Sequence, residues 1–190
     1  MFRKSLALFV VTGLLATLGL LASAFFTSTV TVSNNTFTTG TLNLTASPTT
    51  AALTIGNMAP GDTVTAPITL TNAGSLNLYY AMTSNSTNPD SKALAQQMTL
   101  AIKASVTTCT KSGFGLNGTV IYSGTLANAG FGDPDFDVVG WPLPGDRSLT
   151  AAATEVLCFQ ATLPASTGNT YQGATTTTTF TFDAVQAALP

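Results

Sequence analysis

The chain has 190 residues, a formal net charge of −2 and only 7% charged residues, against about 25% in typical soluble domains. It has no basic patch to bind nucleic acid. With no histidine, it lacks the base of serine and cysteine hydrolases and the ligands of histidine-built zinc sites. We therefore expect no catalytic residue, no metal site and no cofactor.

The N-terminus has the pattern of a secretory signal peptide. Two basic residues precede an uncharged run from Ser5 to Ala24, and small residues end that run, as signal peptidase requires. We predict a signal peptide over residues 1–24, cleaved between Ala24 and Phe25. The run is also about 20 residues long, enough to span a bilayer. An uncleaved membrane anchor is therefore the rival interpretation.

Residues 25–33 alternate in the manner of a half-buried β-strand, with Phe26, Val30 and Val32 on one face and threonines on the other. This segment is either the first strand of its own domain or a donor strand that completes the sheet of the next copy. The predicted donor-strand residues are Phe25, Phe26, Thr27, Ser28, Thr29, Val30, Thr31 and Val32.

Alternating residues and turn signals predict further strands along residues 34–190. The expected strands cover residues 37–44, 51–55, 63–71, 76–82, 100–106, 119–123, 155–163 and part of 173–186, where Phe180, Phe182 and Ala184 share one face. Gly40 marks a bulge or a close backbone approach. Ala59 to Asp62 has the residues of a type II turn, and residues 57–82 are expected to form a hairpin-like unit.

The only predicted helix covers residues 90–97, a Gly-rich loop covers 111–118, and residues 127–147 form a long irregular excursion. These elements indicate an all-β fold, a jelly-roll-like two-sheet sandwich with one short helix and an extended N-terminal donor strand.

Two cysteines, Cys109 and Cys158, are present. In an exported protein one pair indicates a disulfide, and two buried free thiols are the alternative. Asp133, Asp135 and Asp137 alternate and are either a solvated loop or a cation site, although the EF-hand pattern is not met. Candidate N-glycosylation sequons, of a kind that also arises by chance in a Thr-rich chain, begin at Asn34, Asn43, Asn85 and Asn117.

Three stretches resemble the TasA and camelysin family of secreted fibre-forming proteins, which includes the related archaeal bundling pilins. Residues 35–44 are similar to the family's "TFxxGTLDL" box, with Asn43 in place of the usual Asp. Residues 57–76 resemble "NLxPGD…NxGSL", and residues 169–186 resemble "NxYQG…FxFxAxQ". The middle of the chain, about residues 85–155, carries no such match.

The resemblance implies a jelly-roll subunit that is exported and polymerises head-to-tail into an extracellular filament, a pilus or a biofilm-matrix fibre. Its partners would be identical subunits in a homopolymer, with lateral bundling to other fibres, and it would meet the membrane only during export. In that family the N-terminal segment inserts as a strand in the neighbouring subunit, which here points to residues 25–33.

Two other functions stay open. One is a monomeric, membrane-anchored surface sandwich that acts as a binding module. The other is a secreted metallopeptidase, as camelysin has been described, although this sequence offers no ligand set that supports it.

Overall fold

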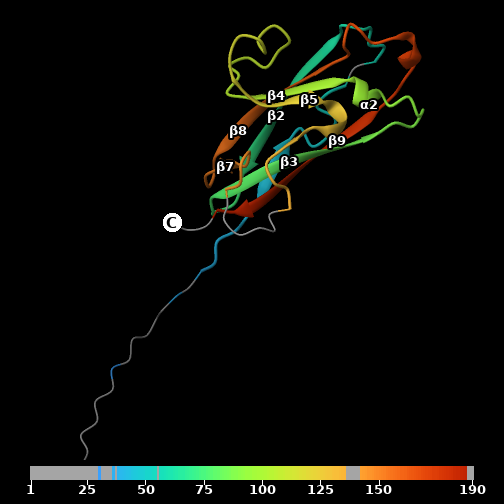
Figure 1. Cartoon of the computed structure of the whole chain (residues 1–190). Helices are drawn as coiled ribbons and strands as arrows, with labels where there is room; N and C mark the ends of the chain where they lie inside the picture. Colours follow the sequence, from blue (N-terminus) through green and yellow to red (C-terminus); the bar gives the residue numbers. More distant parts are fainter. Residues whose placement is uncertain (1–29, 31–35, 37, 55, 136–141, 188–190) are drawn as a thin grey trace, which may run out of the picture. The chain divides into compact units, whose positions relative to one another are not determined.

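A computed structural model describes residues 30, 36, 38–54, 56–135 and 142–187. Within these residues nine strands form two antiparallel sheets (Figure 1). The first sheet has the order β1 (Leu44–Ser47), β2 (Thr63–Asn72), β8 (Thr154–Thr162), β4 (Thr99–Ala104) and β5 (Thr119–Thr125). In the second, β3 (Leu78–Thr87) pairs with β9 (Thr177–Gln186) on one side and with β6 (Gly130–Phe131) and β7 (Arg147–Leu149) on the other. The predicted all-β, two-sheet fold is confirmed.

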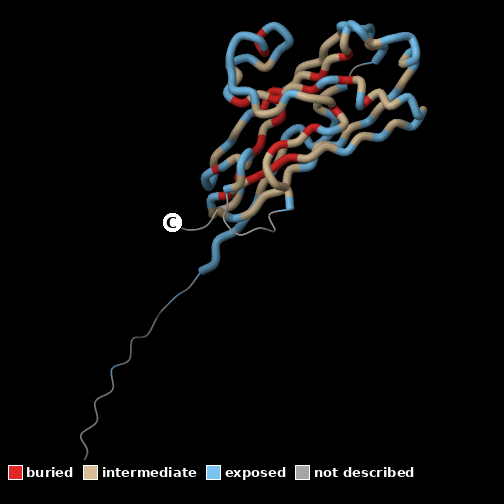
Figure 2. Tube along the Cα trace, in the orientation of Figure 1, coloured by how far each residue is buried: buried red, intermediate tan, exposed pale blue. Residues whose placement is uncertain are grey.

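The core lies between the two sheets, where buried residues of the strands gather (Figure 2). This follows from the period of two along a strand, which sends every second side chain to the same face. The buried side chains between the layers include Ile68 and Leu70 of β2, Leu78, Tyr80 and Met82 of β3, Leu100 and Ile102 of β4, and Leu157 and Phe159 of β8.

The predicted hairpin over residues 57–82 is wrong, because β2 and β3 belong to different sheets. The chain crosses between the sheets at the corner after Asn72, whose side chain is fully buried. Its Nδ2 donates to Leu76 O at 2.8 Å and to Leu149 O at 3.1 Å, and its Oδ1 accepts from Gly74 N at 3.0 Å. A buried amide with partners on both ends holds this corner in one conformation.

The turn at residues 59–62 agrees with the type II prediction. Asp62 N donates to Ala59 O at 2.9 Å, and Gly61 has a φ of 95°, which glycine adopts without steric cost. Gly61 N also donates to Leu163 O at 2.7 Å, so the turn is fixed to the residue that follows β8.

The predicted helix over residues 90–97 is mostly wrong, because α2 covers only Leu94–Gln97. Ser91 and Ala93 have positive φ angles of 58° and 54°, which a right-handed helix cannot contain. The carboxylate of Asp90 accepts backbone N–H groups from Lys92 and Thr175 and so holds this segment as a turn. Two short 3-10 helices, η1 (Leu126–Asn128) and η2 (Asn169–Tyr171), complete the described helical segments.

Two predicted strands near the N-terminus are also corrected. Residues 38–43 do not form a strand, and β1 begins only at Leu44. Residues 51–54 are irregular as well, while Ile55 lies outside the described residues. In both places β-branched residues suggested a strand, but no neighbouring strand pairs with these residues.

One lateral side of the sandwich is closed by the segment between β5 and β6, residues 126–129. Leu126 of η1 is buried there. Its N–H donates to Met98 O at 2.9 Å, and its carbonyl accepts from Ser84 Oγ at 3.1 Å. Because Met98 precedes β4 and Ser84 lies on β3, these bonds link the two sheets along this side.

Candidate functional site

The other lateral side of the sandwich is open and carries a groove. Its rims are the outer strands β1 and β9, and within the described residues neither strand has a partner on its outer side. The groove has a volume of about 320 Å³. It is lined by Leu44, Thr45, Ala46 and Thr49 on one side, Phe180, Thr181 and Phe182 on the other, and Leu70 between them.

Both rims turn backbone hydrogen-bonding groups toward this open side. Ala187 N donates to Asn77 O at 2.9 Å, toward β3. In an antiparallel strand successive residues bond to opposite sides. The odd-numbered residues of β9 therefore bond toward β3, as Ala187 does, and the even-numbered Phe180 and Phe182 turn their backbone groups to the open side. On β1, Asn43 O accepts from Ala73 N at 2.8 Å and so faces β2. By the same alternation, the backbone groups of Leu44 and Ala46 face the open side. The apolar lining residues Leu44, Ala46, Phe180 and Phe182 thus also carry the unpaired backbone groups of the two rims.

The groove walls are mainly apolar, with Thr45, Thr49 and Thr181 among the lining residues, and they are only partly buried. Leu44, Ala46, Phe180 and Phe182 all pack against the core, but none is fully buried. Phe180 lies with its ring centroid 5.1 Å from that of Phe159 in the core. An open strand edge beside incompletely covered aromatic rings can accept a further strand, which would supply both hydrogen bonds and apolar contacts.

Residues that carry the first two family-like stretches meet at the end of the β1 rim. Thr41 N donates to Ser75 Oγ at 2.9 Å, and Thr41 O accepts from Ser75 N at 3.0 Å. A Cβ on Gly74 would lie 2.4 Å from Thr41 O, so only glycine fits this approach. We name residues 39–43 the anchor segment. At Gly40 the close neighbour is the Leu76 side chain, which a Cβ would approach to 2.4 Å, and not a backbone segment as predicted.

The predicted donor strand lies almost wholly outside the described residues. Of its eight residues only Val30 is described, and its side chain is exposed. Ala24, at the predicted cleavage site, also lies outside them. The chain divides into two units, Met1–Thr38 and Thr39–Pro190. The donor strand and the cleavage site therefore stay predictions.

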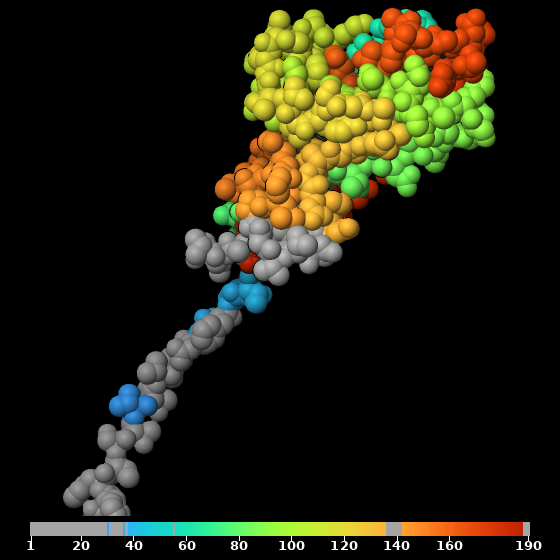
Figure 3. Space-filling view, in the orientation of Figure 1, coloured from blue at the N-terminus to red at the C-terminus, as the bar shows by residue number. Residues whose placement is uncertain are grey.

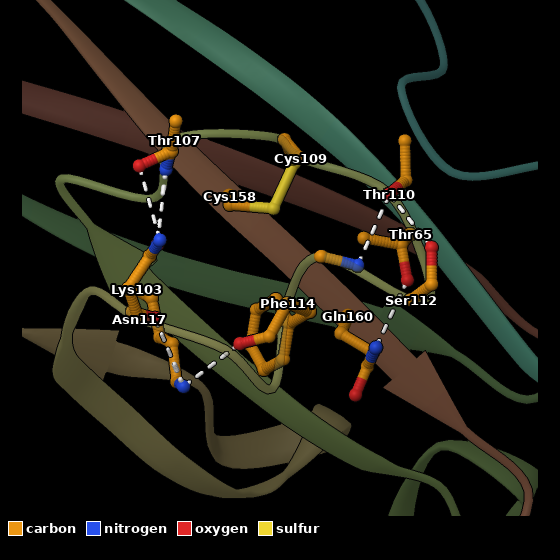
Figure 4. The surroundings of a disulfide bond; sticks show 11 residues. Thr65, Lys103, Thr107, Cys109, Thr110, Ser112, Phe114, Asn117, Cys158 and Gln160 are labelled. Atoms are coloured by element: carbon orange, nitrogen blue, oxygen red, sulfur yellow. Dashed lines mark hydrogen bonds between the residues drawn. A yellow bond between two sulfur atoms is a disulfide. The ribbon is translucent and has the colours of Figure 1, made fainter.

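The predicted disulfide is present and fixes a long loop to the outer face of the first sheet (Figure 4). Cys109 bonds to Cys158 of β8, with a Cα–Cα distance of 5.5 Å. Lys103 Nζ donates to Phe114 O at 2.9 Å and lies 4.9 Å from the centre of the Phe114 ring. In Figure 3 this loop, residues 105–118, and strand β5 lie side by side on the visible face. These contacts hold the loop on the outer face of the first sheet, away from the groove lining.

The four candidate sequons differ in their surroundings. Asn43 and Asn85 are exposed, and Asn34 lies outside the described residues. The side chain of Asn117 is engaged in the loop: its Oδ1 accepts from Thr107 N, and its Nδ2 donates to Thr107 Oγ1, both at 3.0 Å. The amide nitrogen that a glycan would modify is thus already bonded at Asn117.

In the described part of the acidic cluster, Asp133 and Asp135, the hydrogen bonds join carboxylate oxygens to backbone N–H groups. Asp133 Oδ1 accepts from Asp135 N at 3.1 Å, and Asp133 N donates to Asp146 Oδ1 at 2.8 Å. Asp137 lies outside the described residues. Among the residues that are described, no group of three or more Asp, Glu, Cys or His side chains is placed to hold a metal ion.

A polar cluster that the sequence did not indicate joins the two sheets. Glu155 of β8 accepts from the Tyr80 hydroxyl at 2.5 Å and forms an ion pair with Arg147 of β7. Arg147 Nε also lies 3.1 Å from Glu155 Oε2. Burial, reinforced by the bond to Glu155, raises the pKa of Tyr80 above its ordinary value. The only hint in the sequence was that Glu155 is the sole glutamate.

Glu155 also borders a second hollow, of about 420 Å³. It is lined by Ser105, Val106, Ser148, Leu149, Thr154, Glu155 and Val156. Both carboxylate oxygens of Glu155 are already engaged by Arg147 and Tyr80. The arrangement therefore pairs two partly buried charges between the sheets.

The fold and the groove together define a class: an antiparallel β-sandwich with one closed side and one open, apolar side. The family model described as "Camelysin metallo-endopeptidase" matches residues 1–189. The chain belongs to this family, which confirms the resemblance seen in the sequence. Among curated proteins, none matches the chain. In the described part of the chain, no helix has the length and apolar character needed to cross a membrane.

Proposed function

We propose that the protein is a secreted, non-enzymatic subunit of an extracellular filament, a pilus or a biofilm-matrix fibre. Subunits polymerise head-to-tail when the N-terminal strand of one copy, residues 25–33, docks in the groove of the next. The observation that carries this proposal is the open groove between β1 and β9, with apolar walls and unpaired backbone edges. Membership of the camelysin family supports it.

The docking strand has the chemistry that the groove requires. Phe26, Val30 and Val32 share one face of residues 25–33, and burying each would contribute about 1.5–3 kcal/mol. The groove side chains that would receive them are apolar, with Phe180 and Phe182 on the β9 wall. The contact joins two different surfaces of the subunit, so it does not close on itself and a filament grows.

Peptidase activity, which the family description names, does not fit these residues. A metallopeptidase zinc site needs three protein ligands, usually histidines with a carboxylate. The chain has no histidine and only two cysteines, which form a disulfide. Its single glutamate is paired with Arg147. The residues present therefore do not form such a site, and we derive no catalytic step from it.

Electron microscopy of two purified forms tests the proposal. The mature chain beginning at Phe25 should form filaments, whereas a chain beginning at Ser33 should stay monomeric. Filaments from the shorter chain would exclude the docking mechanism.

Two further measurements address the alternatives. Mass spectrometry of the native N-terminus should find Phe25, because an anchored binding module would keep Met1. A casein assay with and without a chelator should detect no chelator-sensitive hydrolysis.

A further inference from the structure

We infer that the incoming strand pairs with β9 and extends the sheet that contains β3, rather than pairing with β1. This assignment rests on the proposed function and adds to it which rim of the groove makes the hydrogen bonds. It is argued from the two rims themselves, which differ in length, in the number of outward backbone groups and in how well each is protected from pairing.

The first argument is length. β9 has ten residues, whereas β1 has four. At about 3.3 Å per residue, β9 spans about 33 Å and β1 about 13 Å. The predicted donor strand has eight residues, Phe25 to Val32, and an extended length of about 26 Å. Only β9 can pair with it over its whole length.

The second argument counts the backbone groups that face the open side. On β1 these belong to Leu44 and Ala46, and Pro48 follows the end of the strand without an N–H to donate. On β9 the outward residues are Thr178, Phe180, Phe182, Ala184 and Gln186. An eight-residue strand turns four residues toward its partner, a number that β9 accommodates and β1 does not.

The third argument is protection. Proteins prevent unwanted pairing at sheet edges with short strands, prolines, lysines and bulges. β1, β6 and β7 are short, with four, two and three residues. β5 has a register shift in its pairing with β4 and contains Gly124. β9 contains no Lys, Arg, Pro or Gly, and its one charged residue, Asp183, is among those whose backbone bonds toward β3. Its register with β3 is continuous over ten residue pairs. Among the described strands, a long outer edge without such protection is found at β9.

A matched pair of proline substitutions tests the assignment. Ala184→Pro removes an outward N–H from β9, and Ala46→Pro removes an outward N–H from β1. Both residues are partly buried alanines whose side chains face the interior, so the two changes are alike in size and burial. Each variant is prepared as the mature chain from Phe25, and circular dichroism and thermal melting establish that it folds.

We expect Ala184→Pro to lose filaments in electron microscopy and Ala46→Pro to keep them. The reverse result, equal loss in both folded variants, or no loss in either would overturn pairing with β9 and leave the filament proposal standing. A wild-type chain that forms no filaments would instead refute the proposed function itself.

Cross-linking decides the matter if a proline variant fails to fold. Side chains on the outer face of a strand lie beside those on the outer face of the strand it pairs with. Thr181 is exposed on the outer face of the sheet that contains β3 and β9. Thr45 is exposed on the outer face of the sheet that contains β1 and β2. Filaments carrying Thr29→Cys with Thr181→Cys should give a ladder of covalent multimers with a short bis-maleimide. Filaments carrying Thr29→Cys with Thr45→Cys should not. A ladder only from the second pair would overturn the assignment.

Discussion

Replacing Phe182 by alanine should weaken filament assembly in addition to lowering the stability of the subunit. The Phe182 side chain lines the groove and is only partly buried in the free subunit. Phenylalanine buries about 150–250 Å², and the part left exposed here is on the order of 50 Å². Covering that area on docking contributes about 1.2 kcal/mol at 25 cal/mol per Å².

That loss has a direct consequence for assembly. Because about 1.4 kcal/mol corresponds to a factor of ten in an equilibrium constant, the critical concentration for polymerisation should rise about sevenfold to eightfold. Sedimentation of filaments over a concentration series measures it. The free energy of unfolding should fall by less than the 3–5 kcal/mol typical of a fully buried phenylalanine.

A control separates loss of the groove from general loss of stability. Phe131 is buried on the closed side, 5.9 Å from the ring of Tyr80. Phe131→Ala should lower the free energy of unfolding by about 3–5 kcal/mol and leave the critical concentration of the folded chain unchanged. If the Phe182 variant assembles at the wild-type concentration, or if the Phe131 variant loses assembly while folded, the groove is not the docking surface.

Three further outcomes are expected. Changing Cys109 and Cys158 to serine releases a loop with a sequence separation of 49 residues, which should lower the free energy of unfolding by about 4 kcal/mol in urea titrations; no change relative to the oxidised wild type would contradict this. Gly74→Ala places a Cβ against Thr41 O and should cost about 1–3 kcal/mol, with faster amide hydrogen exchange at Thr41; unchanged exchange would exclude the steric argument. The pKa of Tyr80 is raised in the folded state, so the unfolded chain loses this proton first and stability should fall as the pH rises above about 10. Tyr80→Phe should reduce that slope in urea titrations, and an unchanged slope would refute the assignment.

Local pattern predicted strands that are rich in apolar and β-branched residues. Residues 63–71 and 155–163 were expected as strands and are found as β2 and β8. In β2 apolar residues alternate, whereas β8 has a continuous apolar run from Val156 to Phe159. The shared face of Phe180 and Phe182 was also expected and is confirmed, since both pack against the core. In these cases the information lies within a few neighbouring residues.

The elements that failed depend on distant partners. Residues 38–43 have strand-like composition, but Thr41 is held by Ser75, 34 residues away. The helix expected at residues 90–97 is shortened because the Asp90 carboxylate accepts Thr175 N, 85 residues away. Single-sequence periodicity contains no information about either bond.

The groove could not be predicted because it depends on the order of strands in both sheets. Leu44 and Phe180 lie near opposite ends of the sequence, and only the arrangement of β1 and β9 brings them to one opening. The sequence predicted a donor strand at residues 25–33, but it did not indicate which surface would bind that strand. The Tyr80, Arg147 and Glu155 cluster was missed for the same reason.

The anchor segment also bears on how such a polymer would carry tension. A pull on the chain at Thr39, directed along β1, would reach Thr41–Ser75, Asn43–Ala73 and the pairing of β1 with β2 together. Bonds that lie across the direction of pull share the force, whereas bonds peeled from one end fail one at a time. Under a pull along β1, the anchor segment and β1 would thus resist stretching by loading these bonds at the same time.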